Sequence, residues 1–164
     1  YFDFLNRVGP VAEELKKSGI WAYAHPWLNL LIPGERTAEV TREILAGVTA
    51  ADVGAGLILL YPLDRARLHA PLLRVPDDPV PYLFAILAAV PADGTATVER
   101  LLAANRAAYE RTEAAGGTQY PVGSVPFRPQ DWRAHYGERW PQLAAAKRRY
   151  DPKGLLAPGQ GVFG

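Results

Sequence analysis

The chain has 164 residues, no cysteine, and 18 basic side chains against 17 acidic ones. This length suits one ordinary domain with a substantial core. Balanced charge gives no footprint for nucleic acid or an anionic membrane. The absence of cysteine excludes disulfides, thiolate nucleophiles and Cys-ligated zinc. The three histidines are far apart without metal-ligand spacing, and no apolar run reaches the roughly 18 residues of a membrane span.

The first half of the sequence alternates predicted helices and strands. An amphipathic pattern predicts a helix over 3–18, in which Pro10 marks a start or a kink. An extended segment follows over 24–33, and a second helix is predicted over 37–48 with an apolar stripe. The apolar run at 56–62 is typical of a strand buried on both faces.

The second half completes the pattern. Residues 64–80 are polar and proline-rich, which predicts a long loop, and 81–90 predicts a third strand between prolines. The longest helix is expected over 95–115, with Asn105 on its inner face. A fourth strand is expected at 118–122. This order is that of the ferredoxin-like split βαβ arrangement.

The fold class is therefore α+β: a ferredoxin-like antiparallel sheet with helices on one face, plus a C-terminal helical tail. In the tail, one or two helical turns are expected at 131–136 and a last helix from Pro141 to Tyr150. Residues 153–164 have little capacity for regular structure, and without a packing partner we expect them to be poorly ordered.

The segment Ala24 to Pro33 is the most distinctive part of the sequence. Along an extended backbone, successive side chains point to opposite faces, so Trp27, Asn29 and Leu31 share one face, and Leu28, Leu30 and Ile32 share the other. An amide between two large apolar neighbours needs a partner if it is buried. A core strand in which Asn29 bonds neighbouring backbone and a pocket wall in which it meets a ligand both fit this pattern.

No catalytic constellation appears in the sequence. It has no GxSxG, no P-loop and no glycine-rich strand-to-helix turn. The Asp77–Asp78 pair is expected to point into solvent, and Arg148–Arg149 is interpreted as a solvated helix face. Because the sequence begins at Tyr1 inside a helical pattern, we interpret it as a piece of a longer polypeptide.

A series of short motifs runs in order nearly from end to end. The most specific is HPWLN at 25–29, followed by LLxPGQ at 155–160, and around them stand YFDFLNRV at 1–8, LYPL at 60–63 and the set DW, HYG, YDPK within 131–153. Together they resemble the C-terminal part of the cytokinin dehydrogenases, FAD-linked oxidases of the vanillyl-alcohol-oxidase superfamily.

The resemblance implies a domain division and a function. Residues 1–125 would belong to the substrate (cap) domain and 126–164 to a segment that returns to the FAD-binding domain. The intact enzyme would oxidise the C–N bond in the side chain of an adenine-type cytokinin, with FAD as its cofactor. Its small-molecule partner would be that cytokinin or another amine or alcohol.

The resemblance also implies site residues. Trp27 and Asn29 would line the substrate channel, Leu57 and Leu59 would form apolar pocket wall with Leu87 opposite, and Gln160 would reach the flavin. No catalytic residue is expected among these 164. Leu57 stands where the family has proline, and the segment 120–124 lacks the family's tyrosine, so an oxidase acting on a different alcohol or amine is a second interpretation.

The FAD tether, the diphosphate-binding segment and the catalytic aspartate of that family have no counterpart in these residues. We therefore expect the chain alone neither to bind FAD tightly nor to turn over substrate, because a missing FAD-binding domain is its partner. A third interpretation is a free-standing ferredoxin-like module that binds a small molecule or dimerises. An uncovered apolar sheet face makes a homodimer an expectation under either interpretation.

Overall fold

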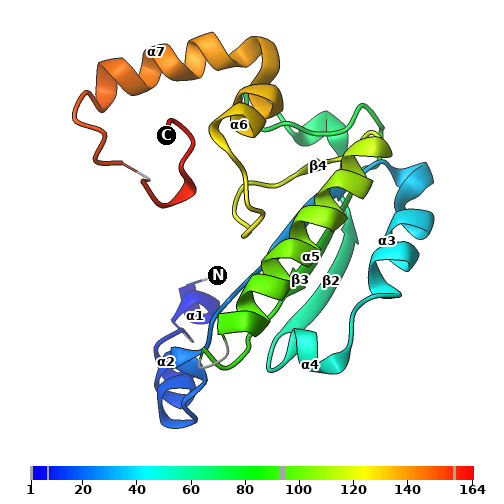
Figure 1. Cartoon of the computed structure of the whole chain (residues 1–164), viewed down its shortest axis with the longest axis vertical. Coiled ribbons are helices and arrows are strands. Elements are labelled where there is room, and N and C mark those ends of the chain that lie inside the picture. Colours follow the sequence, from blue (N-terminus) through cyan, green and yellow to red (C-terminus); the bar gives the residue numbers. More distant parts are fainter. Residues whose placement is uncertain (1, 7, 93–94, 157) are drawn as a thin grey trace.

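A computed structural model describes residues 2–6, 8–92, 95–156 and 158–164. Four strands form one sheet: β1 (Leu28–Ile32), β2 (Leu57–Pro62), β3 (Tyr82–Leu87) and β4 (Thr118–Gln119). The helices are α1 (Phe2–Leu5), α2 (Val8–Lys17), α3 (Thr37–Leu45), α4 (Ala50–Val53), α5 (Thr95–Ala114), α6 (Pro129–Tyr136) and α7 (Trp140–Tyr150). Figure 1 shows α5 along the sheet, α1 and α2 at one end, and α6 and α7 at the other.

The strand order is β2-β3-β1-β4, and the three neighbouring pairs in this order are antiparallel. The sequence order strand, helix, strand, strand, helix, strand with this spatial order is the split βαβ arrangement. The ferredoxin-like α+β prediction is confirmed, as is the long loop that separates β2 from β3. The short helix α4 has no counterpart in the prediction, and β4 is shorter than expected.

The main core lies between the sheet and its helices. Alternate residues of β1, which are Leu28, Leu30 and Ile32, face this core and are 0–1% exposed. They meet Val40 and Ile44 of α3 and Ala108 and Tyr109 of α5. The predicted alternation along β1 is confirmed, because Leu31 belongs to a separate cluster with Leu83 and Ala85 on the opposite face.

The long loop after β2 covers part of that opposite face. Leu73 and Val75 from this loop pack against Leu31 and its neighbours. The loop is fixed by Asp78, whose carboxylate accepts hydrogen bonds from the backbone N–H of Gly34 at 3.0 Å and of Val80 at 2.7 Å. Of the Asp77–Asp78 pair, Asp77 is exposed as predicted, whereas Asp78 fixes the loop.

The prediction that β2 is buried on both faces was wrong. All six of its residues are exposed, and Leu57 to Tyr61 have exposed fractions of 36–50%. The strand pairs with β3 on one side and forms the edge of the sheet on the other. An apolar run predicts that both faces of a strand are covered, but it does not predict whether the same chain or another polypeptide covers them.

The single N-terminal helix predicted over 3–18 is two helices in the structure. α1 ends at Leu5 and α2 begins at Val8, so the break comes before Pro10, which sits in the first turn of α2 where its missing N–H costs nothing. Residue 7 lies outside the described residues. Val8 and Val11 are 66% and 56% exposed, and no described side chain of α2 is buried.

The C-terminal helices α6 and α7 match their predicted positions. Beyond them, the backbone folds back: the indole Nε1 of Trp132 donates to the carbonyl of Gln160 at 3.0 Å, and the rings of Trp140 and Phe163 lie 5.4 Å apart. Within 153–164, Gln160 and Phe163 therefore do have packing partners in α6 and α7, contrary to the expectation, whereas the poor order of this segment stays a prediction. No local sequence pattern connects the aromatic side chains of these helices with the tail.

Candidate functional site

The residues expected at a substrate site lie in two rows that cross the sheet. In the first row, Asn29 of β1 pairs with Ala85 of β3, and Ala85 pairs in turn with Leu59 of β2. Asn29 has the same strand parity as Leu31, so its side chain points away from α3 and α5. The row therefore joins an amide, a small residue and an exposed leucine on the face opposite α3 and α5.

The second row lies one step further along the strands. Leu87 of β3 pairs with Leu57 of β2, as the expectation of opposed leucines required. Ala24 pairs with Val90, and Leu28 pairs with Ile86, so the two segments keep one antiparallel register between these positions. In that register, Trp27 lies opposite Leu87. The fold thus brings five residues that are up to 60 positions apart in the sequence into one patch.

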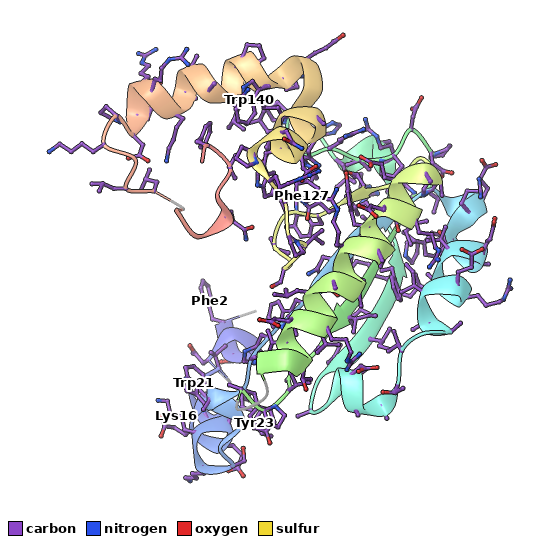
Figure 2. The ribbon with its side chains drawn as sticks, viewed as in Figure 1. Phe2, Lys16, Trp21, Tyr23, Phe127 and Trp140 are labelled. Atoms are coloured by element: carbon purple, nitrogen blue, oxygen red, sulfur yellow. The ribbon has the colours of Figure 1, made fainter. Side chains whose placement is uncertain are left out.

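Trp27 lines an apolar groove of about 520 Å³. We call this the Trp27 groove, and its other lining residues come from α2, the turn after it, the residues before β1 and the loop after β4: Leu15, Ile20, Trp21, His25, Val122 and Ser124. Trp27 is 38% exposed and meets the His25 ring edge-on at 5.9 Å. Figure 2 shows Trp21 and Lys16 together at this end of the molecule, with the Lys16 ammonium 5.5 Å from the Trp21 ring centre.

Asn29 is buried with only 5% of its surface exposed. Its Nδ2 has no hydrogen-bond partner among the described residues. A buried amide without a partner costs on the order of 1–3 kcal/mol. The Nδ2 donor of Asn29 therefore does not bond neighbouring backbone, as the core-strand interpretation would require.

Gly123 separates Asn29 from the Trp27 groove. A Cβ on Gly123 would stand 2.9 Å from the Trp27 carbonyl oxygen and 3.3 Å from Asn29 Nδ2. Only glycine brings the backbone this close to both residues without a clash. Because its neighbours Val122 and Ser124 line the groove, the loop forms the wall between groove and amide.

The leucines form an exposed apolar surface. Leu57 is 50% exposed, Leu59 is 36% exposed, and Leu87 is half-buried against the Leu31 cluster. Leu87 continues the same surface as its cross-strand partner Leu57, so these residues make one wall. Such a wall suits the face of a flat apolar ligand, which a few polar groups then orient.

Gln160 lies apart from the other predicted site residues. Its backbone carbonyl accepts a hydrogen bond from Trp132 of α6, and its side chain is exposed. Figure 1 shows the tail beside α6 and α7, away from the strand ends that carry the two rows. The expected cofactor residue and the expected substrate residues are therefore on separate parts of the molecule.

The strongly perturbed titratable groups belong to structural networks. The backbone N–H of Thr49 and the Arg100 guanidinium lower the pKa of Asp52. Hydrogen bonds from the Arg128 guanidinium hold the pKa of Asp131 below its ordinary value, although burial acts to raise that pKa. Burial lowers the pKa of His135 from 6.5 to about 4. None of these three groups lines the Trp27 groove, whose described lining is apolar apart from His25 and Ser124.

Several residues of this region lie beyond the reach of sequence reasoning. Trp21 and Val122 come from segments that have no motif pointing to a site. Asn105 does carry a signal, because it is a polar residue on the predicted inner face of a helix, and the structure buries it against the backbone of the Trp27 segment. The close approach of Gly123 depends on the tertiary fold and leaves no mark on the local pattern.

The described residues offer neither a metal centre nor a membrane-spanning helix. No three His, Asp or Glu side chains among them lie close enough to hold a metal ion. None of the helices in the described ranges is long and apolar enough to cross a membrane.

The fold is an α+β domain, and one face of its sheet carries exposed leucines beside the Trp27 groove. A family model described as "Cytokinin dehydrogenase 1, FAD and cytokinin binding" matches residues 1–163. The protein therefore belongs to the cytokinin dehydrogenase family of oxidoreductases, as the resemblance of its motifs predicted.

Named relatives agree with this family. The sequence is 37% identical over 172 residues to cytokinin dehydrogenase 5 and 40% identical over 172 residues to cytokinin dehydrogenase 3, both of Oryza sativa subsp. japonica. It is 36% identical over 159 residues to an uncharacterized oxidoreductase, ORF5 in the fasciation locus of Rhodococcoides fascians. These alignments take in 97–99% of the 164 residues but only 31–36% of each relative, so the chain spans about a third of their length.

Proposed function

We propose that this chain is the C-terminal part of an FAD-dependent oxidoreductase that oxidises the C–N bond in the side chain of an adenine-type cytokinin. Residues 1–125 form part of the substrate cap, and residues 126–164 return to an FAD-binding domain supplied by other polypeptide. The observation that carries the proposal is the pairing of half-exposed Trp27 in an apolar groove with Asn29, a buried amide whose donor is unpaired among the described residues.

These two residues divide the work of binding. The indole of Trp27 offers an apolar face to a planar ring, and the groove offers about 520 Å³ of space beside it. Nδ2 of Asn29 is a donor for a ring nitrogen, which an adenine-type ligand carries. Gly123 lies between the amide and the groove, and as a glycine it places no side chain there.

The residues present fit a contact with the flavin rather than a binding site for a whole FAD. Gln160, an exposed amide in the tail, is the residue that would reach the flavin, whereas Leu57 and Leu59 give the substrate an exposed apolar wall. The described segments contain no glycine-rich strand-to-helix turn for the diphosphate. FAD, held mainly by the absent domain, supplies the two-electron oxidation, while this chain binds and orients the substrate.

The exposed edge strand favours a part of a longer protein over a free-standing module. β2 leaves five large apolar side chains between 36% and 50% exposed, which an independent ferredoxin-like domain would have to protect. A homodimer of this chain through that strand is the alternative cover. An oxidase of the same kind acting on another amine or alcohol is the second candidate, because Leu57 replaces the family's proline in the apolar wall.

The test uses the full-length polypeptide that contains this chain, purified with its flavin. Adding an adenine-type cytokinin without oxygen should bleach the flavin absorbance band. Trp27→Ala should raise the KM about tenfold, because losing an aromatic contact removes about 1.5 kcal/mol or more.

Leu45→Ala serves as the control, since Leu45 has the same 38% exposure but lies on α3. A flavin that cytokinin leaves oxidised, but that another amine or alcohol reduces, would replace the substrate class. A KM unaffected by Trp27→Ala would remove the groove from the site.

A further inference from the structure

Asn105 contacts three backbone carbonyls in the two segments that contribute Trp27 and Ser124 to the Trp27 groove. It lies near the middle of α5, and its Nδ2 is 3.0 Å from the carbonyl oxygen of Pro26, 3.4 Å from that of Trp27 and 3.3 Å from that of Ser124. A carbonyl oxygen can only accept, so three acceptors fix the amide with its nitrogen toward them. One side chain of the helix layer thus bonds both segments that carry the groove.

The two segments are also bonded to each other at the same place. The backbone N–H of Ser124 donates to the Trp27 carbonyl at 2.6 Å, and Gly123 lies directly against that carbonyl. Asn105 therefore completes a joint among α5, the residues before β1 and the loop after β4. Pro26, Trp27 and Ser124 are the residues whose backbone this joint fixes.

Asn105 is unusual for its position in the helix. Only 7% of its surface is exposed, and its neighbours on the inner face, Leu101 and Ala108, are apolar. Asparagine is a weaker helix former than leucine, and burying its amide costs free energy unless the amide is bonded. A leucine would suit the helix and the core better, so the contribution of Asn105 is its set of hydrogen bonds.

From this geometry we propose that Asn105 is a positioning residue that sets the place of Trp27 in the substrate groove. The inference rests on the proposed function for the binding role of Trp27. Asn105 acts through the backbone from the helix side of the sheet and does not touch the substrate. Its loss should let the Trp27 segment and the Ser124 loop separate, and substrate binding should weaken while flavin binding stays.

The kinetic test is made on the full-length flavoenzyme with an adenine-type cytokinin. Asn105→Leu should raise the KM about tenfold, with kcat within about twofold and flavin content per polypeptide unchanged. Thr112→Val is the matched control, because Thr112 is also buried on α5 and its Oγ1 has no partner among the described residues. It should leave both constants unchanged.

A double mutant separates positioning from a general loss of structure. If Asn105 acts through Trp27, adding Asn105→Leu to Trp27→Ala should change the KM little further, since coupled residues are not additive. Fully additive effects would overturn the proposal, as would an unchanged KM in Asn105→Leu. If Asn105→Leu is insoluble, Asn105→Ala replaces it in both experiments.

A second measurement does not depend on the substrate. Amide hydrogen exchange on the full-length protein should be about tenfold faster at Ser124 in Asn105→Leu than in wild type, with exchange at Ser124 unchanged in Thr112→Val. Unchanged exchange in Asn105→Leu overturns the inference whatever the substrate is. If the wild-type enzyme does not act on cytokinin but the exchange difference is present, the proposed function and the binding role of Trp27 are overturned. The joint formed by Asn105 is then still established.

Discussion

Asp52 carries a buried charge that three donors hold in place. Its Oδ2 accepts from the backbone N–H and the hydroxyl of Thr49, both at 2.8 Å, and its other oxygen binds the Arg100 guanidinium. We expect Asp52→Asn to lower the free energy of unfolding by about 1–3 kcal/mol at neutral pH, because hydrogen bonds to a charged group are lost. Chemical denaturation measures this, with Asp77→Asn, an exposed carboxylate, as the control.

The same carboxylate predicts an acid dependence. Its pKa is lowered in the fold, so its stabilising effect is complete above the ordinary value of 3.8 and is lost as the pH falls through the lower folded value. The difference between wild type and Asp52→Asn should therefore shrink in acid. A difference that is constant with pH would contradict the ionic role of Asp52.

His135 predicts a pH dependence in a higher range. The ring is 2% exposed among Phe127, Trp132 and Tyr136, and burial lowers its pKa from 6.5 to about 4. Between these values the unfolded chain binds the proton that the folded chain excludes, so stability falls as the pH drops from 6.5 toward 4, by up to about 3 kcal/mol.

The measurement is the free energy of unfolding of the protein across that range. His135→Gln should remove most of the slope, whereas His69→Gln, which changes an exposed histidine, should keep it. Equal slopes in wild type and His135→Gln would show that another group carries the dependence.

At the scale of elements, β2 predicts self-association of this chain. Its exposed leucines and its unpaired edge offer a template for another strand. Replacing Leu57 and Leu59 with lysine should reduce dimers and larger species in analytical ultracentrifugation. The control replaces Val8 and Val11 of α2 with lysine, since these are also exposed. Should the α2 variant dissolve the dimers instead, the interface lies at the N-terminal helices.

The turn after α7 predicts how firmly the tail is held. Asp151 accepts from the backbone N–H of Leu155 at 2.8 Å and of Leu156 at 2.9 Å, and Lys147 binds the same carboxylate, which lowers the pKa of Asp151 to about 2. Asp151→Asn should speed amide exchange at Leu155 and Leu156 about tenfold. Lys153→Gln, which changes a charge in the same tail, should not, and equal rates in the two variants would dismiss the turn as the anchor.

Elements were predictable where the local pattern determines them. The alternation in β1 and the apolar stripes of α3 and α5 follow from periodicity, and both gave the correct buried face. The exposure of β2 was not predictable, because its apolar run requires cover that the described residues do not supply. The break between α1 and α2 comes before Pro10, the residue that marked the predicted start or kink, so the sequence pattern did not locate it.

The candidate site was predictable only as a set of residues. Motif resemblance named Trp27, Asn29, Leu57, Leu59 and Leu87, and strand pairing then arranged them in two rows. The joint at Asn105 could not be predicted, because it connects α5 with segments 19 and 79 positions away in the sequence. Contacts of that range depend on the whole fold rather than on any local pattern.

At the scale of the whole molecule, the structure predicts the result of purifying this chain alone. It should show no flavin absorbance band, because the described residues contain no glycine-rich strand-to-helix turn that would hold the FAD diphosphate. The full-length polypeptide prepared in the same way should carry flavin. A stoichiometric flavin band on these 164 residues alone would contradict this and would assign cofactor binding to them.

The hydrogen bond from Trp132 to the Gln160 carbonyl gives the molecule a built-in optical reporter. Trp132 is 1% exposed, so its fluorescence should be blue-shifted and shielded from soluble quenchers while the C-terminus is docked. Release of the terminus would open the indole to water and shift its emission to the red. With Trp21, Trp27 and Trp140 replaced by phenylalanine, the emission of Trp132 alone would report whether the last residues are docked.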